Sequence, residues 1–277
     1  MTTQLARVSF LGVGKMGEAF LSGLLKSGYD PDLIKVYDTN VDRMAEVVNG
    51  YQVKDAKEPR EAATWGKFLI LAVKPKDVRD ALSPINDLNE RKIIISFVAG
   101  TSSSYIARYV PKLTTVLRSM PNLSCRVGQG IIGVARSTRL EDVEYQEALE
   151  LLRRTGLVYE VEEELLDLLT GYTGSGPAYV CAFIEALTNA GTIMGLSLEL
   201  SSDMALQLVR GTSSLLIEGG LSPEELRRMV TTPGGTTAKG LEALDKGGFR
   251  GCIIEAIKSA TQRAKEIHRE IDLKGDS

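Results

Sequence analysis

Short apolar runs alternate with amphipathic stretches along roughly the first 160 residues. The runs richest in β-branched residues are typical of buried strands: RVSFLG, LIKVYD, KFLILAV, KIIISFVAG and TTVLRS. The later runs IIGVAR and GLVYEV could extend the same sheet. Because strands that alternate with helices are typical of βαβ units, the pattern predicts an α/β domain with a mainly parallel, doubly wound sheet.

The pattern changes after about residue 162, where the strand-like runs end. Beyond it, apolar residues follow helical spacing, as in Val180, Phe183, Ile184, Leu187 and Met194, and again in Phe249, Ile253, Ile257, Ala260 and Ala264. We therefore expect an α/β domain at residues 1–162 and an all-α C-terminal domain at residues 163–277. The two are expected to join near Val161 to Leu165 and to pack together.

A glycine motif lies between the first predicted strand and the helix that follows it. Gly12, Gly14 and Gly17 form the pattern G-x-G-x-x-G, after the strand Val8 to Leu11 and across the start of the helix Lys15 to Leu25. The first glycine permits a tight turn, the second lets the backbone approach a pyrophosphate, and the third lets the helix pack closely on the strand. The helix N-terminus then faces the anion. In this context the motif predicts a Rossmann-type dinucleotide-binding domain.

The second predicted strand ends at Asp38, roughly 20 residues after the last glycine, where an acidic side chain can bind the adenosine ribose hydroxyls. That carboxylate would repel a 2′-phosphate and favours NAD(H), whereas Arg43 could pair with the phosphate and favours NADP(H). Arg43 could equally lie on a solvated helix face. We expect NAD(P)H as the cofactor, with Asp38 favouring NAD(H).

Two further turns follow predicted strands and are expected at the ligand edge of the sheet. LAVKP at residues 71–75 ends in a Lys-Pro turn, and SFVAG ends in two small residues that would admit the nicotinamide ribose. Ordinary loop punctuation is the alternative explanation of both turns. The expected cofactor-binding residues are Gly12, Val13, Gly14, Lys15, Met16, Gly17, Asp38, Arg43, Ala72, Val73, Lys74, Pro75, Ala99 and Gly100.

Composition and charge argue against several classes of partner. The 277 residues carry 33 Lys and Arg against 36 Asp and Glu, a formal net charge of -3, with no basic stripe of the kind that neutralises nucleic-acid phosphates. No apolar run approaches the roughly 18 residues of a membrane span, and the first residues do not resemble a signal peptide. We expect a cytoplasmic protein that binds neither nucleic acid nor membrane.

Histidine and cysteine are scarce. His268, the only histidine, lies in the charged stretch RAKEIHREID and is expected on a solvated helix face. Cys125, Cys181 and Cys252 lie far apart without CxxC spacing, so we expect buried reduced thiols and neither disulfides nor a metal site. Because a histidine-based triad is excluded, the chemistry must depend on a cofactor, a carboxylate or a hydroxyl.

The segment VTTPGGTTAKGL at residues 230–241 places hydroxyls and glycines between two predicted helices, with no His, Cys, Asp or Glu among them. A helix N-cap with its turn would account for such a loop, because Thr and Pro suit both positions. The residues taken alone leave open whether the loop also binds a ligand.

Six motifs in a fixed order give the sequence a specific resemblance to the pyrroline-5-carboxylate reductases, which reduce a cyclic imine to L-proline with NAD(P)H. They are the glycine motif at Gly12–Gly17, AVKP at Ala72–Pro75, MPN at Met120–Asn122, GSGPAY at Gly174–Tyr179, TPGGTT at Thr232–Thr237 and GGFR at Gly247–Arg250. The resemblance covers nearly the whole chain. The Pro-Gly-Gly-Thr-Thr segment is its most discriminating part.

The resemblance implies that the loop binds the carboxylate of pyrroline-5-carboxylate, because N–H groups at a helix N-terminus and hydroxyls hold a carboxylate without Arg or His. It implies that Thr237 is the catalytic residue, hydrogen-bonded to the ring nitrogen, while the cofactor carries the hard step. It also implies a homodimer or a higher oligomer of dimers, joined through the helical domain. The implied substrate-binding residues are Ser175, Gly176, Val230, Thr232, Gly234, Gly235, Thr236 and Thr237.

Some features leave alternatives open. Leu123 and Ser124 stand where the family usually has Thr-Pro, which puts in doubt the shape of the loop beside the cofactor. One alternative is a related NAD(P)-dependent imine reductase or β-hydroxyacid dehydrogenase. The hydroxyacid enzymes usually use a Lys from the helical domain, but Lys239 and Lys258 lie in no recognisable motif. Another is a non-catalytic dinucleotide-binding paralogue.

Overall fold

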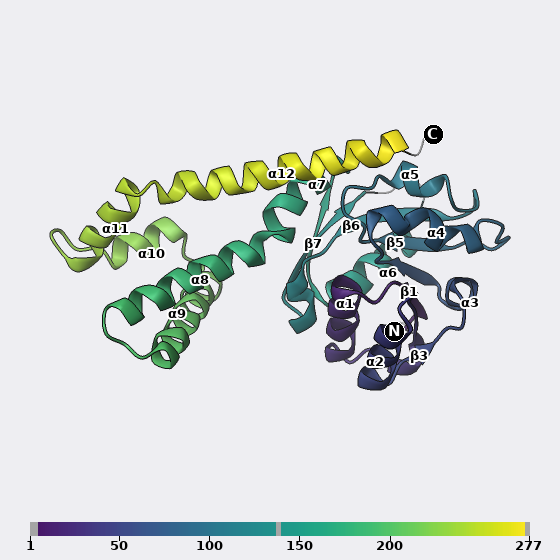
Figure 1. Ribbon diagram of the computed structural model, residues 1–277, viewed down its shortest axis with the longest axis horizontal. Coiled ribbons are helices and arrows are strands. Elements are labelled where there is room, and N and C mark those ends of the chain that lie inside the picture. The colour runs from purple at the N-terminus through teal and green to yellow at the C-terminus, as the bar shows by residue number, and fades with distance from the viewer. Residues whose placement is uncertain (1–4, 137–139, 275–277) are drawn as a thin grey trace. The chain divides into compact units, whose positions relative to one another are not determined.

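The computed structural model describes residues 5–136 and 140–274. The chain forms two compact units, Met1–Ser175 together with Ser259–Ser277, and Gly176–Lys258. The first unit is α/β and the second is helical (Figure 1). The compact units divide later than the predicted boundary at residue 162, and the last helix has residues in both of them. The division into a dinucleotide-binding part and a substrate-binding part therefore stays a prediction about function.

An eight-stranded sheet lies at the centre of the first unit, in the order β3-β2-β1-β4-β5-β6-β7-β8. Neighbouring strands are parallel except for β6 and β7, which are antiparallel. Every apolar run named from the sequence forms a strand, so the predicted fold class is confirmed. The short strand β3 was missed because its Lys and Asp show no apolar pattern. The strands are β1 Val8–Leu11, β2 Ile34–Tyr37, β3 Lys54–Asp55, β4 Phe68–Leu71, β5 Ile93–Ser96, β6 Thr115–Met120, β7 Gly130–Ala135 and β8 Gly156–Val161.

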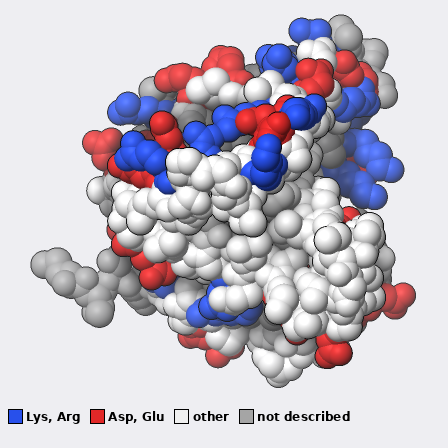
Figure 2. Space-filling view, turned by 90° about the vertical axis from the view of Figure 1, so that its left-hand side faces the viewer, with Lys and Arg blue, Asp and Glu red and all other residues white. Residues whose placement is uncertain are grey.

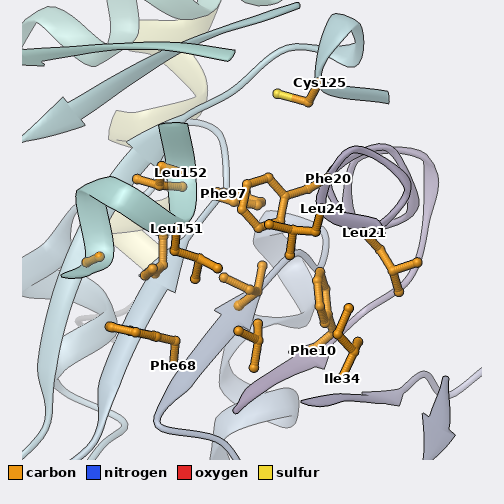
Figure 3. Packing of buried hydrophobic residues seen from close by; sticks show 14 of the residues in the cluster. Phe10, Phe20, Leu21, Leu24, Ile34, Phe68, Phe97, Cys125, Leu151 and Leu152 are labelled. Atoms are coloured by element: carbon orange, nitrogen blue, oxygen red, sulfur yellow. The ribbon is translucent and has the colours of Figure 1, made fainter. Parts of the chain in front are cut away.

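Buried side chains form two clusters, one on each face of this sheet. Successive residues of β4 alternate between them, so Phe68 belongs to one cluster and Leu69 to the other. Figure 3 shows the first cluster, where Phe20 and Phe97 meet edge to face with ring centroids 4.9 Å apart. Burial on both faces explains why the parallel strands are continuous apolar runs. The helices of this unit are α1 Lys15–Lys26, α2 Val41–Tyr51, α3 Pro59–Trp65, α4 Val78–Leu82, α5 Ser103–Ala107, α6 Asp142–Arg153 and α7 Leu165–Leu169, which continues into a π-helical turn at Thr170–Gly174.

The second unit contains only helices, turns and loops within its described residues, which confirms the all-helical prediction. Its first two helices pack closely, because a Cβ added to Gly191 would lie 2.1 Å from the Ser201 hydroxyl. That hydroxyl donates to the Thr188 carbonyl at 2.7 Å. Across the described residues, every helix is too short or too polar to cross a membrane. The helices are α8 Gly176–Ile193, α9 Leu198–Gly219, α10 Pro223–Met229, α11 Thr236–Lys246 and the first part of α12 Phe249–Lys274, whose residues from Ser259 onward belong to the first unit.

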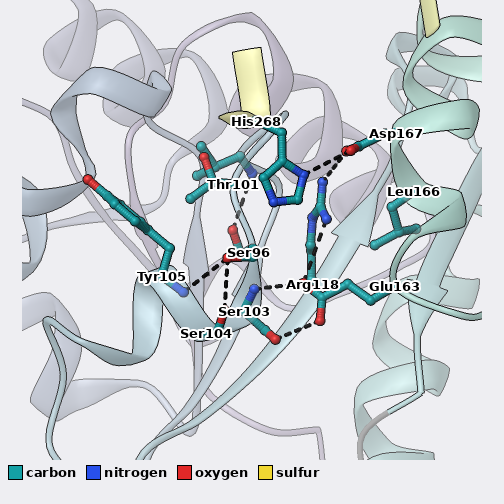
Figure 4. A network of polar contacts seen from close by, with 12 residues as sticks. Ser96, Thr101, Ser103, Ser104, Tyr105, Arg118, Glu163, Leu166, Asp167 and His268 are labelled. Atoms are coloured by element: carbon teal, nitrogen blue, oxygen red, sulfur yellow. Dashed lines mark hydrogen bonds and ion pairs between the residues drawn. The ribbon is translucent and has the colours of Figure 1, made fainter. Parts of the chain in front are cut away.

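Within the first unit, a polar network holds the C-terminal part of α12 against β6 and α7 (Figure 4). Arg118 of β6 donates to one Asp167 oxygen at 2.7 Å, and Nδ1 of His268 lies 2.9 Å from the other. Glu163 accepts hydrogen bonds from the Ser103 backbone N–H at 2.7 Å and from its hydroxyl at 2.6 Å. The expectation of a solvated His268 is wrong, because its carboxylate partner lies far away in the sequence.

The cysteines differ from one another in burial. Cys125 is buried, and that burial raises the pKa of its thiol. Cys181 on α8 and Cys252 on α12 are exposed, so the expectation that all three are core residues is wrong for these two. Helical spacing by itself does not show which face of a helix is covered.

Candidate active site

A cleft of about 690 Å³ opens at the carboxyl ends of β1, β2 and β4. The strand order reverses between β1 and β4, and open α/β sheets bind ligands at such a point. The cleft is also lined by Asn40, Asp77 and Asp80, which lie in no motif of the sequence. The predicted cofactor-binding residues that line it are Gly12, Gly14, Asp38, Arg43, Ala72, Val73 and Lys74.

The glycine loop has the geometry that a bound dinucleotide requires. Gly12 has φ +93°, and a Cβ there would lie 2.6 Å from the Ala72 carbonyl oxygen. A Cβ on Gly17 would lie 2.4 Å from the Gly12 carbonyl oxygen, so this glycine allows α1 to pack on the loop. Gly14 has open space around its Cα and precedes α1 as its N-cap, without a side-chain capping bond. The free helix N-terminus and open backbone fit a pyrophosphate.

Asp38 connects the glycine loop to the start of α2. It accepts a hydrogen bond from the Val13 backbone N–H at 2.8 Å and another from the Asn40 backbone N–H at 2.9 Å. Asn40 in turn caps α2 by accepting from the backbone N–H of Arg43 at 3.0 Å. A carboxylate oxygen accepts more than one hydrogen bond, so Asp38 can still bind ribose hydroxyls.

Arg43 is held beneath the same loop. Its Nε donates to the Val13 carbonyl at 3.1 Å, its Nη1 donates to Glu46 at 3.1 Å, and its Nη2 forms an ion pair with Glu18. Partial burial would lower the pKa of Arg43, but the hydrogen bonds with Glu46 and Glu18 outweigh it and the pKa is raised. Arg43 is therefore a paired residue within the cleft.

The other predicted cofactor residues have different surroundings. Val13 is buried, and its backbone N–H and carbonyl bond to Asp38 and Arg43. Pro75 lies in a neighbouring hollow. Gly100 has φ +62°, and a Cβ there would lie 2.9 Å from Cγ2 of Ile267 on α12, so helix packing accounts for this glycine. Contacts of the cofactor with Lys15, Met16, Gly17, Pro75, Ala99 and Gly100 stay predictions.

The hydroxyl-rich loop joins α10 to α11 in the second unit. Gly234 has φ +71°, and the Gly235 backbone N–H donates to the Thr232 carbonyl at 3.0 Å. Gly235 is the N-cap of α11 and no side chain of the described chain caps this helix. The helix thus begins with Thr236 and Thr237, with free N–H groups beside two hydroxyls. The N–H groups left free at a helix start and the positive end of the helix dipole favour an anion.

Asn122, the last residue of the MPN motif, holds the segment around Ser175 in place. Asn122 donates to the Thr173 carbonyl at 3.1 Å and accepts from the Ile131 backbone N–H at 3.2 Å. The Ser175 hydroxyl donates to the Thr170 carbonyl at 3.1 Å, and Gly176 then begins α8. Asn122 is therefore a positioning residue for this turn, and only its side-chain partners reveal that role.

The fold, the glycine loop and the cleft define a class: a Rossmann-type oxidoreductase that uses NAD(P)H. Comparison with known proteins is consistent with that class. Residues 7–100 match the family described as NADP oxidoreductase, coenzyme F420-dependent, and residues 163–267 match the family described as pyrroline-5-carboxylate reductase dimerisation.

Three relatives identify the family. The chain is 36% identical to a pyrroline-5-carboxylate reductase of Synechocystis, over 95% of this chain and 99% of the relative. The solved pyrroline-5-carboxylate reductase of Coxiella burnetii superposes with a TM-score of 0.87 at 29% identity, covering 95% of this chain and 99% of that one. The Plasmodium falciparum pyrroline carboxylate reductase, solved with NADP bound, gives 0.84 at 25% identity, covering 95% and 98%. The chain belongs to the pyrroline-5-carboxylate reductase family.

Proposed function

We propose that this protein reduces 1-pyrroline-5-carboxylate to L-proline with NAD(P)H, the final step of proline biosynthesis. The observation that carries the proposal is the uncapped start of α11, with its Pro-Gly-Gly-Thr-Thr sequence, in a chain that has 36% identity to a named reductase. The substrate has one carboxylate and one ring nitrogen, and this helix start offers N–H donors and hydroxyls for them.

The reaction adds a hydride to the imine carbon and a proton to the imine nitrogen. Bound NAD(P)H supplies the hydride. In the proposed site, N–H groups at the start of α11, together with Ser175 and Gly176, hold the carboxylate. The Thr237 hydroxyl donates a hydrogen bond to the ring nitrogen and relays a proton to it from solvent water, so that the hydroxyl regains the proton that it gives. The reaction takes up a proton, so no strong general base is needed. The ring nitrogen gains electron density as the hydride arrives and accepts the proton more readily.

We further propose a homodimer, or a higher oligomer of dimers, that works in the cytoplasm. Residues 163–267 match a dimerisation family, and large apolar side chains of the second unit are exposed in the single chain. Figure 2 shows a broad area without charged side chains on the side that faces the viewer. Large apolar side chains that are exposed together mark interaction sites. The exposed residues include Val180, Phe183, Met194, Leu206, Leu208 and Ile217.

The test is steady-state reduction of 1-pyrroline-5-carboxylate by wild type, Thr237→Val and Thr237→Ser. Removing the hydroxyl should lower kcat on the order of 10²-fold while cofactor binding stays the same. Thr237→Ser, which keeps the hydroxyl, should retain most of the rate. Thr64→Val removes an exposed threonine hydroxyl of α3 that bonds only within its own helix, and serves as the matched control. Equal rates for Thr237→Val and wild type would remove Thr237 from the mechanism.

A further inference from the structure

Two charged side chains that could distinguish NADH from NADPH, Asp38 and Arg43, line the cleft. Arg43 already forms an ion pair with Glu18. Asp38 stands where the adenosine ribose is expected, and Arg43 is the cation that could bind a 2′-phosphate. We infer that Glu18 is a specificity-determining residue: it holds the guanidinium of Arg43 in an internal ion pair, so the site selects NADH over NADPH. The inference deepens the proposed function by fixing its cofactor.

Every nitrogen of the Arg43 guanidinium has a partner within the protein. Nε donates to the Val13 carbonyl, Nη1 donates to Glu46 and Nη2 pairs with Glu18. The side chains of Arg43 and Glu18 are 28% and 17% exposed, whereas Glu46 is 69% exposed. Partial withdrawal from water strengthens the pair with Glu18 relative to the pair with Glu46. Glu18 is therefore the stronger restraint on Arg43.

Glu18 is itself fixed in place. It follows Gly17 in the first turn of α1, and its Oε1 accepts a hydrogen bond from the Tyr51 hydroxyl at 3.0 Å. Nη2 of Arg126 lies 4.0 Å from the same oxygen, and the Arg126 side chain is 59% exposed. If Arg43 turned toward a phosphate, Glu18 would keep a half-buried charge with only these weaker partners. Binding NADPH would thus require breaking an ion pair that NADH leaves intact.

The remaining charges of the cleft act in the same direction. Its lining contains the carboxylates of Asp38, Asp77 and Asp80 against the cations of Arg43 and Lys74. A phosphate monoester carries about -1.5 to -2 charges at pH 7. The 2′-phosphate of NADPH would therefore enter a cleft in which the charge of Arg43 is already neutralised by Glu18. Ribose hydroxyls, in contrast, can donate to Asp38. A relative that was solved with NADP bound shares the fold, so the fold by itself does not exclude NADP.

The experiment is titration of purified protein with NADH and with NADPH, followed by the fluorescence of the bound nicotinamide, without any imine present. Wild type should bind NADH at least about tenfold more tightly than NADPH. Glu18→Gln should tighten NADPH binding about tenfold and change NADH binding less than about threefold. The gain should disappear in the double variant Glu18→Gln/Arg43→Met. Glu46→Gln is the matched control, and should change the ratio of the two affinities less than about threefold.

Arg43→Met supplies an independent outcome if Glu18→Gln fails to fold. Because Arg43 is already paired in the wild type, its loss should change NADPH affinity less than about threefold. A loss of NADPH affinity of tenfold or more in Arg43→Met would overturn the inference, and so would an unchanged NADH to NADPH ratio in folded Glu18→Gln. Protein that binds NADH selectively but does not reduce the imine would refute the proposed function and leave the cofactor selectivity standing.

Discussion

Replacing Arg118 by methionine tests how the buried network supports the fold. The Arg118 and Asp167 side chains are 3% and 7% exposed, and their nearest polar atoms lie 2.7 Å apart. Removing one partner of such a pair leaves an uncompensated charge and costs about 3–5 kcal/mol. His268 still contacts the other Asp167 oxygen, so we expect the lower end of this range, about 3 kcal/mol.

The assay is thermal unfolding followed by circular dichroism at one protein concentration. A loss of 1 kcal/mol lowers the Tm by about 2–4 °C in a chain of 150–250 residues, so Arg118→Met should lose about 6–12 °C. Arg263→Met is the matched control, because Arg263 pairs with Glu266 and Glu270 on the surface, where its side chain is 57% exposed. The control should keep a Tm close to that of wild type, because ion pairs on the surface contribute little to stability.

The double variant Arg118→Met/Asp167→Leu separates the pair from its parts. Replacing both members of a buried ion pair by apolar residues is often nearly neutral, so the double variant should lose less than the sum of the single variants. A Tm for Arg118→Met that equals the Tm of Arg263→Met would refute the reasoning. Strict additivity in the double variant would show that the two side chains do not stabilise each other.

Three further predictions concern other parts of the molecule. Gly17→Ala forces a Cβ to within 2.4 Å of the Gly12 carbonyl oxygen, so NADH affinity should fall at least about tenfold in a fluorescence titration; unchanged affinity would show that the loop tolerates the shift. Ile217→Glu adds a charge on α9 at a side chain that is 81% exposed in the single chain. If α9 forms the subunit interface, light scattering should show a smaller assembly. An unchanged mass would place the interface elsewhere. Burial and the raised pKa of Cys125 should keep its thiol unreactive toward Ellman's reagent until denaturant is added; equal thiol counts before and after denaturation would contradict its burial.

Most of the sheet could be predicted because its signals are local. Strands that are buried on both faces must be apolar along their whole length, and glycines at a tight turn have no substitute. The strand Val8–Leu11, the glycine loop and the start of α1 at Lys15 therefore followed from one stretch of sequence. Lys54–Asp55 was missed because a two-residue strand needs only backbone pairing with β2 and no apolar side chain.

The surroundings of some residues depend on partners that are distant in the sequence. His268 lies among charged residues, but it meets Asp167 across 101 positions of sequence. Gly100 is predicted to let the cofactor approach, and the structure adds that α12 lies against it. The sequence left open whether Arg43 meets a phosphate or lies on a solvated helix face, and the structure adds its pairing with Glu18 on another helix. The local sequence pattern identifies the chemical groups. Tertiary packing decides which of these groups are free to bind a ligand.

Product stoichiometry shows whether this protein reduces the imine to L-proline. Purified protein is mixed with 1-pyrroline-5-carboxylate and NADH or, separately, NADPH, and the loss of cofactor absorbance is compared with the L-proline formed. We expect one L-proline for each cofactor oxidised, with NADH used more efficiently than NADPH. Protein that binds cofactor but leaves both the imine and the absorbance unchanged would contradict the proposed function and indicate a dinucleotide-binding protein without this activity.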